Sequence, residues 1–312
     1  MLHRPILFTI FGASLASCVP LTAQAPTADP GRDPALQALI WTQHAAERRA
    51  LCRLVFNAAR TVLNDARNDP TWTAALEQSG MKDMDSLPTA IIVDVDETVL
   101  DNSPHQVRLC ATGAAFDAEK TWGPWVREKQ ASPLPGAVEF LTQAAQLGVT
   151  IYYVTNRDHE LEPETRANLA RLGFPLQDDG DTDVVLTLHE RESFGSDKTT
   201  RRAFVAQSHR ILMLFGDDLG DFMSGVRPDP ATSRAAAEIR GAHGKALEQE
   251  RSDRVDDFAD WFGTRWFVLP NVMYGSWLDV AKLQANAIPS PEPGTPSIDF
   301  APLLLRKPLA GK

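Results

Sequence analysis

Short apolar runs alternate with helix-like segments through the middle of the 312-residue chain. Five of these runs are rich in β-branched or aromatic residues, which is the composition of buried strands. They span 90–93, 149–154, 184–188, 211–215 and 266–269. Helical patterns lie between them at 137–147, 162–172 and 197–208. This alternation predicts an α/β fold with a Rossmann-like parallel sheet core and helices on both faces.

Three further regions interrupt this alternation or precede it. Residues 34–68 have a helical pattern, which ends at Asp69-Pro70. Residues 101–135 contain no convincing strand, and residues 226–262 are rich in charge. We expect the N-terminal helices and the inserted segments to form a smaller, mainly helical cap. The folded domain is then predicted to span 34–285, followed by a C-terminal extension over 286–312.

The first residues of the chain have the pattern of an export signal. His3 and Arg4 precede an apolar run over 6–16 that is too short to cross a bilayer. Leu15-Ala16-Ser17-Cys18 then matches the lipobox of bacterial lipoproteins, which predicts lipidation of Cys18. The alternative is ordinary cleavage after Ala23-Gln24-Ala25.

Both alternatives predict an exported protein, as an outer-membrane lipoprotein or in the periplasm. Residues 1–25 form the signal region in this interpretation, and 26–33 form a tether rich in small and polar residues. Two cysteines remain besides Cys18, namely Cys52 and Cys110. The sequence leaves open whether they form a disulfide or stay as two free thiols.

The formal net charge of −10 restricts the partners of the protein. An acidic chain repels nucleic acid polymers and anionic membrane surfaces, so we expect no nucleic acid partner and membrane contact only through a lipid anchor. A site that handles phosphate in such a protein needs a metal ion and a few local cations.

Groups suited to phosphoryl chemistry follow four of the predicted strands. They are Asp94 and Asp96 after the first, Thr155, Asn156 and Arg157 after the second, Lys198 some residues after the third, and Asp217, Asp218 and Asp221 after the fourth. Each has an ordinary explanation when taken alone, since Asp217 and Asp218 could simply cap a helix. Ligands of open parallel sheets bind beyond the carboxyl ends of the strands, however, and all these groups are expected at that edge.

These residues supply the parts of a phosphatase mechanism. Asp94, at a strand tip, is a candidate nucleophile that would form an acyl phosphate. Asp96 is a candidate general acid and base. Mg²⁺ prefers oxygen ligands, which Asp94, the backbone carbonyl of Asp96 and Asp217 would provide. Lys198 and Thr155 would hold the remaining phosphoryl oxygens.

The same residues resemble the motifs of the haloacid dehalogenase superfamily, and in particular the class C acid phosphatases, the bacterial outer-membrane lipoprotein 5′-nucleotidases. The similar segments are 94–104 (DVDETVLDNSP), 122–126 (WGPWV), 135–140 (PGAVEF), 153–157 (YVTNR), 171–174 (RLGF), 216–222 (GDDLGDF) and 269–277 (LPNVMYGSW). They cover roughly residues 35–285 and appear in the expected order.

The resemblance implies a phosphomonoester hydrolase acting on nucleoside 5′-monophosphates. It assigns Asp94 as nucleophile and Asp96 as acid/base, and it adds Asp221 to the metal site. Phosphate binding would involve Thr155, Asn156 and Lys198. Trp122 and Tyr274 occupy the positions of an aromatic clamp for the nucleoside base. Trp122 and Trp125 are three residues apart and could instead share one packed face of a helix, but we expect Trp122 to face the ligand and Trp125 to lie in the core.

Two alternatives remain open at this point. The first is a phosphatase of other small phosphomonoesters, or a phosphotransferase of the same superfamily. The second is a non-catalytic surface binding protein, which the presence of Asp94 argues against. Residues 227–257 depart from the family pattern, so the identity of the substrate stays open. The pH optimum and the choice between monomer and homodimer also stay open.

Overall fold

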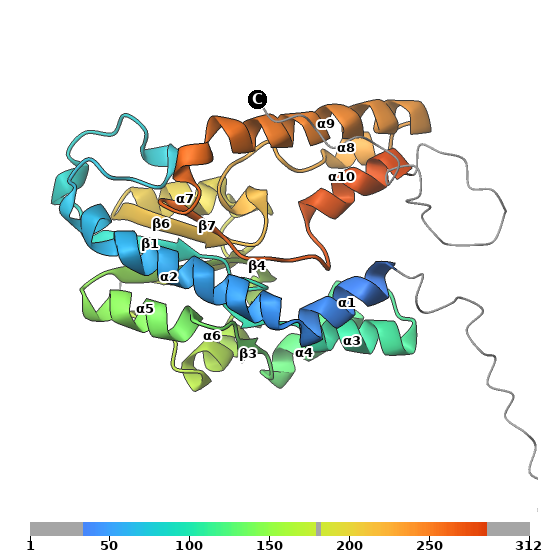
Figure 1. Cartoon of the computed structure of the whole chain (residues 1–312), viewed down its shortest axis with the longest axis horizontal. Coiled ribbons are helices and arrows are strands. Elements are labelled where there is room, and N and C mark those ends of the chain that lie inside the picture. Colours follow the sequence, from blue (N-terminus) through green and yellow to red (C-terminus); the bar gives the residue numbers. More distant parts are fainter. Residues whose placement is uncertain (1–33, 179–181, 286–312) are drawn as a thin grey trace, which may run out of the picture.

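The computed structural model of the chain describes residues 34–178 and 182–285. The signal region 1–25 with Cys18, the tether 26–33 and the extension 286–312 lie outside the described residues. Within those residues, five parallel strands form one sheet in the order β5-β4-β1-β6-β7, of which β1, β4, β6 and β7 are labelled in Figure 1. The strands are β1 Thr89–Val93, β4 Thr150–Asp158, β5 Val185–Leu188, β6 Arg210–Gly216 and β7 Trp266–Val268. All five predicted strands are confirmed.

The central strand β1 pairs with β4 on one side and with β6 on the other. Ala90 lies opposite Thr150 in β4 and opposite Ile211 in β6. The predicted strand at 149–154 is longer in the structure, because β4 continues to Asp158. Thr155 and Asn156 therefore belong to the strand itself rather than to the loop after it.

Helices cover both faces of the sheet, as predicted. Helices α5 (Ala137–Gln146) and α6 (Glu162–Arg171) lie on crossovers that run outward from β1, whereas α7 (Thr199–Ala206) returns from β5 to β6. Because such crossovers are right-handed, α7 packs on the opposite face from α5 and α6. Helix α2 (Ala46–Asn68) joins α5 on the first face and contacts β6 and β7.

A row of phenylalanines forms the core beneath α2 and α5. The ring centroids of Phe56 and Phe215 are 5.5 Å apart, and those of Phe215 and Phe267 are 4.8 Å apart. Phe140 from α5 completes the row, and all four side chains are buried. Burial of large aromatic side chains is among the strongest apolar contributions to stability, so this row ties α2 and α5 to the sheet.

The remaining helices build the cap, mostly beyond the carboxyl edge of the sheet, and α9 also runs alongside the strands (Figure 1). They are α1 Pro34–His44, α3 Ser103–Thr112, α4 Gly123–Glu128, α8 Pro230–Ser233, α9 Ala237–Asp257 and α10 Ser276–Ala285. Helix α1 packs on α3, and α9 packs on α10. The N-terminal helices thus divide between two layers, because α1 joins the cap while α2 covers the sheet.

Short helical turns complete the structure. They are η2 Leu76–Gln78, η3 Met84–Ser86, the π-type turn η4 Ala118–Trp122, η5 His159–Leu161, η6 Leu219–Asp221 and η7 Ala259–Trp261. The expectation of no strand over 101–135 was wrong in one detail. Strand β2 (Leu100–Asp101) pairs antiparallel with β3 (Ser132–Pro133). Strands of two residues are too short to produce an alternating pattern, and Pro133 is a residue that disfavours strands.

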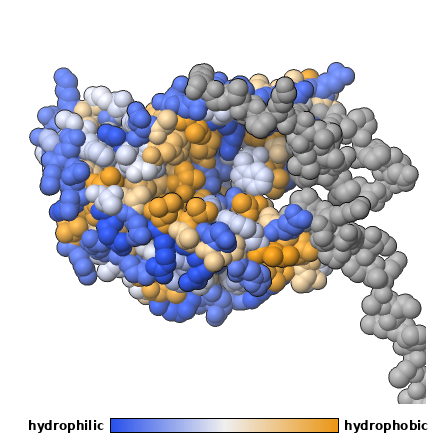
Figure 2. All heavy atoms as spheres, viewed as in Figure 1, coloured by the Kyte–Doolittle hydropathy of each residue, from blue (hydrophilic) through white to orange (hydrophobic). Residues whose placement is uncertain are grey.

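Both described cysteines are free thiols, Cys52 buried and Cys110 exposed. In the view of Figure 2, polar residues cover much of the surface and apolar residues form separate patches. None of the helices in the described part of the chain combines the length and the apolar character needed to cross a membrane.

Candidate active site

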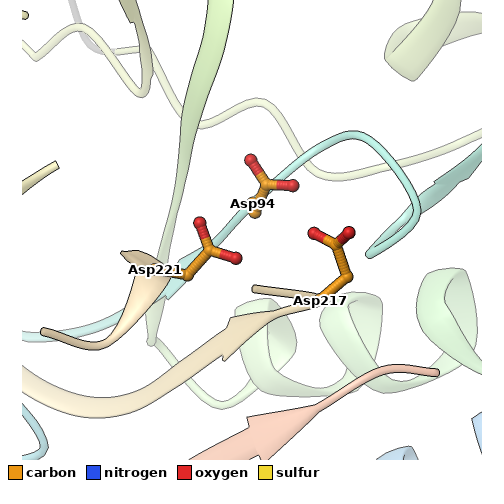
Figure 3. A group of neighbouring side chains, drawn as sticks. All are labelled: Asp94, Asp217 and Asp221. Carbon is orange, nitrogen blue, oxygen red and sulfur yellow. The ribbon is translucent and has the colours of Figure 1, made fainter. Parts of the chain in front are cut away.

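Three carboxylates from two strand ends meet at the carboxyl edge of the sheet. Asp94 follows β1, Asp217 follows β6, and Asp221 lies at the end of η6. Their side chains point toward one another (Figure 3), and one oxygen from each lies within 4.8 Å of the others. The three aspartates therefore share the carboxyl edge of the sheet, as the sequence predicted.

The local backbone explains this arrangement. The amide of Asp94 donates to the carbonyl of Phe215 at 2.9 Å, which continues the β1–β6 pairing one residue past the strand. Asp218 caps η6 by accepting a hydrogen bond from the Gly220 amide, and its own amide donates to Asp221 Oδ2 at 3.0 Å. A side chain at Gly216 would collide with the Asp221 carboxylate, so only glycine allows Asp221 to fold back onto the strand end.

Lys198 supplies the cation of this cluster. It occupies the N-cap position of α7, its side chain is only 4% exposed, and its Nζ contacts the Asp94 carboxylate. The same Nζ lies 2.7 Å from Asp221 Oδ1. Burial alone would lower the pKa of Lys198, but the charges of Asp221 and Asp94 raise it above its ordinary value. The lysine is therefore held in its charged form.

The acids carry more negative charge than Lys198 balances. Burial raises the pKa of Asp94 to about 7, and the nearby Asp221 and Asp96 add to this shift. Burial also raises the pKa of Asp217 well above its ordinary value, helped by Asp221 and Asp94. Buried carboxylates that repel one another and offer only oxygen ligands fit a hard divalent cation such as Mg²⁺. The buried aspartate cluster is thus a candidate metal site.

Asp96 lies beside this cluster and is held by Arg157 and Asn102. Arg157 Nη2 is 2.7 Å and Arg157 Nε 3.1 Å from Asp96 Oδ1, and Asn102 Nδ2 donates to the same oxygen at 2.8 Å. Arg157 is almost fully buried, and its Cζ atom lies 5.5 Å from the centre of the Trp122 ring. The orientation of the Asp96 carboxylate is therefore fixed by neighbours from β4 and from the segment after β2.

A cavity of about 460 Å³ opens above the carboxylates. Its floor is formed by Asp94, Asp96, Asn156, Lys198, Asp217, Asp218 and Asp221. Its walls are formed by Gln106, Phe116, Trp122, Arg227, Tyr274, Gly275, Ser276, Leu278, Asp279 and Lys282. A polar floor beneath partly aromatic walls, in a volume of this size, is typical of a small-molecule site.

Of the predicted phosphate-binding residues, Asn156 and Lys198 line the cavity and Thr155 does not. Thr155 is fully buried in β4, and its Oγ1 accepts a hydrogen bond from the Arg157 amide at 3.1 Å. Arg201 of α7 donates to the Thr155 carbonyl, and to Asn156 Oδ1 at 2.5 Å. Asn156 is thereby held at the end of β4, next to the N-terminus of α7.

The predicted aromatic residues differ in their surroundings. Trp122 and Tyr274 both line the cavity, whereas Trp125 is buried, 2% exposed. Trp122 packs edge-on against His105, with ring centroids 5.3 Å apart. Tyr274 lies after β7, and its hydroxyl donates to the Glu97 carboxylate. The two rings therefore belong to separate segments that meet at the cavity.

Several residues of the site were not singled out as functional from the sequence. They are Glu97, Asn102, Arg201, Arg227 and Asn271. Asn271 Nδ2 donates to Asp217 Oδ2 at 2.7 Å, and Asp218 accepts from the Ser276 amide and from Ser276 Oγ. These bonds tie the loop after β7 to the loop after β6. The motifs that contain Asn102 and Asn271 could have marked these residues as functional, but nothing in the sequence indicated their hydrogen-bond partners.

The charged segment 226–262 reaches the site in two ways. Arg227 lines the cavity with its Nη2 atom 3.4 Å from Asp218 Oδ1. Arg251 of α9 donates to Ser276 Oγ at 2.6 Å, and α9 packs on α10, which contributes Lys282 and its neighbours to the wall. The segment therefore shapes the cavity wall directly through Arg227 and indirectly through the packing of α9 on α10.

The fold is a parallel sheet with an aspartate pair after its first strand, a lysine at the start of a helix, and an acidic loop after the fourth predicted strand. This combination defines a phosphohydrolase of the haloacid dehalogenase (HAD) type. Residues 22–277 match the family model described as HAD superfamily, subfamily IIIB (acid phosphatase), and the chain belongs to this family. The protein is therefore an acid phosphatase, a phosphomonoester hydrolase.

Two solved structures of a class C acid phosphatase from Bacillus anthracis are similar to this chain, and one of them is a crystal structure with tungstate bound. Each is 30% identical, with a TM-score of 0.60, and the similarity covers 80% of this chain. It covers 89% of the tungstate-bound chain and 88% of the other. The resemblance to class C acid phosphatases is thereby confirmed.

Proposed function

We propose that this acid phosphatase is an exported, Mg²⁺-dependent enzyme that hydrolyses nucleoside 5′-monophosphates through an aspartyl-phosphate on Asp94. The observation that carries the proposal is the buried cluster of Asp94, Asp217, Asp221 and Lys198 beneath a cavity with aromatic walls. The cluster combines a carboxylate at a strand tip with the positive charge that phosphoryl oxygens require.

In the first chemical step, a carboxylate oxygen of Asp94 attacks phosphorus and the ester P–O bond breaks. Asp96 gives its proton to the leaving oxygen, which departs as an alcohol. In the second step, Asp96 takes a proton from water while the water oxygen attacks phosphorus. The bond to Asp94 breaks, inorganic phosphate leaves, and both carboxyl groups return to their starting states.

The other phosphoryl oxygens would be held by Lys198 and Asn156, with Thr155 supporting them from β4. Asp94, Asp217, Asp221 and the backbone carbonyl of Asp96 would hold Mg²⁺. When bound, the ion supplies positive charge that offsets the repulsion between the carboxylates and the anionic substrate.

The substrate class rests on Trp122 and Tyr274 in the cavity wall. Flat aromatic surfaces favour a nucleoside base, which presents a π face for stacking. The alternatives are other small phosphomonoesters, or transfer of the phosphoryl group to an alcohol. In the second case, Asp96 would deprotonate the acceptor alcohol instead of water.

A phosphate-release screen with and without Mg²⁺ tests the proposal. It includes nucleoside 5′- and 3′-monophosphates, nicotinamide mononucleotide, sugar phosphates and p-nitrophenyl phosphate. We expect release only with the metal, and the highest kcat/KM with a nucleoside 5′-monophosphate. A clear preference for sugar phosphates would contradict the substrate class and leave the reaction class in place.

Export and anchoring are part of the proposal and rest on the sequence at Cys18. Stable membrane attachment needs two signals, such as the two acyl chains of a diacylated N-terminal cysteine. Intact-mass measurement of protein extracted from its native membrane is expected to show a lipidated chain that begins at Cys18. An unlipidated chain that begins at Pro26 would show that the signal is cleaved after Ala25.

A further inference from the structure

Glu97 is an acidic residue of the first motif that the mechanism does not use. It is 2% exposed, and its φ of 57° lies in the left-handed region that residues with a side chain rarely adopt. Such a conformation costs about 1 kcal/mol or more, and it persists only where the surroundings fix it. A strained, buried carboxylate directly after the proposed acid/base Asp96 calls for a structural reason.

The Glu97 carboxylate joins two parts of the site. Its Oε1 accepts a hydrogen bond from the Asn102 backbone amide at 2.7 Å. Its Oε2 accepts one from the hydroxyl of Tyr274, a residue of the cavity wall, and lies 3.4 Å from Asn102 Nδ2. Glu97 thus connects the loop after β7 with the segment after β2.

Asn102 carries this connection on to Asp96. Its side chain is fully buried, and its Oδ1 accepts a hydrogen bond from Trp125 Nε1 at 2.8 Å. Because an indole nitrogen can only donate, the oxygen of the amide must face Trp125 and the NH₂ group must face the carboxylates. Asn102 Nδ2 then donates to Asp96 Oδ1 at 2.8 Å.

The two oxygens of Asp96 are left unequal by these contacts. Oδ1 accepts from Asn102 and from both Arg157 Nη2 and Arg157 Nε. Among the described residues, Oδ2 has only the longer contact from Arg157 Nε, at 3.3 Å. Oδ2 is therefore the oxygen that remains available to exchange a proton with a substrate or with water.

We propose that Asn102 is a positioning residue that directs Asp96 Oδ2 toward the leaving oxygen, and that the Tyr274 hydroxyl holds Asn102 in place through Glu97. The inference rests on the proposed function, in which Asp96 protonates the leaving group. A misdirected general acid reduces the rate because proton transfer requires close contact between the acid and the leaving oxygen. Tyr274 would then contribute to chemistry through its hydroxyl, separately from any stacking by its ring.

The leaving group provides a readout that a general structural role does not affect. Methyl phosphate releases a poor leaving group that needs the proton of Asp96, whereas p-nitrophenolate leaves as a stable anion without it. The value of kcat/KM covers the steps up to the transfer to Asp94, in which the leaving group departs. Methyl phosphate also has no base that could contact the Tyr274 ring.

The experiment measures kcat/KM for both esters, with Mg²⁺, in wild type, Tyr274→Phe and Asn102→Ala. Tyr274→Phe removes one hydroxyl from a wall residue, so it decides the question even where Asn102→Ala does not fold. The matched control is Tyr153→Phe, which removes a hydroxyl that donates to the Pro175 carbonyl away from Asp96. Phosphate release from both esters by wild type establishes the proposed reaction class independently of the variants.

We expect Tyr274→Phe to lower kcat/KM for methyl phosphate by about tenfold or more, with a change of about twofold or less for p-nitrophenyl phosphate. Asn102→Ala is expected to lower kcat/KM for methyl phosphate further. The double variant Asn102→Ala/Tyr274→Phe should have the same kcat/KM as Asn102→Ala alone, because both substitutions act on one hydrogen-bond network. The control should keep the wild-type ratio of the two esters. An unchanged ratio in Tyr274→Phe, or an equal loss on both esters, would overturn the proposal.

Discussion

The floor and the wall of the cavity are built in different ways. On the floor, Asp94 is 7% exposed and Lys198 is 3% exposed, and both are held by the ends of core elements. On the wall, Phe116 is 61% exposed and the Lys282 side chain 40%. These wall residues come from the inserted segment after β2 and from α10. The buried floor is suited to a reaction that does not vary, and the exposed parts of the wall are suited to the choice of substrate.

This contrast assigns different consequences to changes in the two regions. A change of Asp94 or of the proposed metal ligands affects groups that every phosphomonoester must meet, so its effect should not depend on the substrate. A change on the wall that keeps the hydrogen bond to Glu97 affects only substrates that reach it, whereas loss of the Tyr274 hydroxyl acts through Asp96 on esters with a poor leaving group. Variants of the two regions are therefore expected to differ in how strongly their effects depend on the substrate.

Replacing Asp94 by asparagine is expected to abolish turnover of every phosphomonoester while leaving the fold intact. An amide cannot form the acyl phosphate, and it is a poor ligand for Mg²⁺. Phosphate release by the purified variant is measured alongside its circular dichroism spectrum. Activity within about tenfold of wild type would contradict the covalent mechanism, since losing a nucleophile usually costs far more.

Removing the metal is expected to reduce phosphate release from all substrates by about a hundredfold or more, because the buried carboxylates then repel the substrate. The measurement is activity after treatment with a chelator, followed by addition of Mg²⁺. Asp217→Asn should raise the Mg²⁺ concentration needed for half-maximal activity. As a matched control, Asp279→Asn changes a wall carboxylate that lies outside the cluster and should leave that concentration unchanged.

The stability of the metal-free protein should fall as the pH rises. Burial, together with Asp221 and Asp96, raises the pKa of Asp94 from 3.8 to about 7 in the folded state. Between these values the folded protein retains a proton that the unfolded chain has released, so the free energy of unfolding decreases with rising pH in that window.

Urea unfolding in the presence of a chelator, at about pH 5 and about pH 7.5, measures this dependence. Asp94→Asn cannot ionise at this position and should make the loss of stability smaller. Wild type and variant with the same dependence on pH would show that Asp94 is already ionised in the metal-free protein at pH 5.

The same contrast explains what the sequence could predict. The five strands and the cluster at their ends were predictable because apolar runs mark buried strands and parallel strands present their carboxyl ends at one edge. The pair β2 and β3 was missed because two residues show no alternation. Thr155 was expected directly after the second strand, but β4 continues past it to Asp158.

The contacts of the wall and of Asp96 could not be predicted from one sequence. Asn102 and Arg157 hold Asp96 through side-chain hydrogen bonds between residues up to 61 positions apart. The bond between Tyr274 and Glu97 spans 177 positions. Such pairs depend on how the loops pack on the finished sheet, and neither periodicity nor composition carries that information.

The smallest expected effect concerns the wall, and it separates the ring of Tyr274 from its hydroxyl. Trp122→Ala and Tyr274→Ala should lower kcat/KM for a nucleoside 5′-monophosphate, relative to that for methyl phosphate, by about tenfold. Stacking on a base contributes about 1–3 kcal/mol in nucleic acid binders, and about 1.4 kcal/mol corresponds to that factor.

Tyr274→Phe is the matched control for this measurement, because it keeps the ring and removes the hydroxyl that contacts Glu97. Both substrates release an alkyl alcohol, so a defect in the proton donor should lower their kcat/KM values together and leave the ratio unchanged. A ratio that falls in the alanine variants and stays constant in the phenylalanine variant would assign base recognition to the ring. If the alanine variants lose both activities in equal proportion, the rings of Trp122 and Tyr274 do not recognise the base, and the cavity belongs to a phosphatase whose specificity lies in other wall residues.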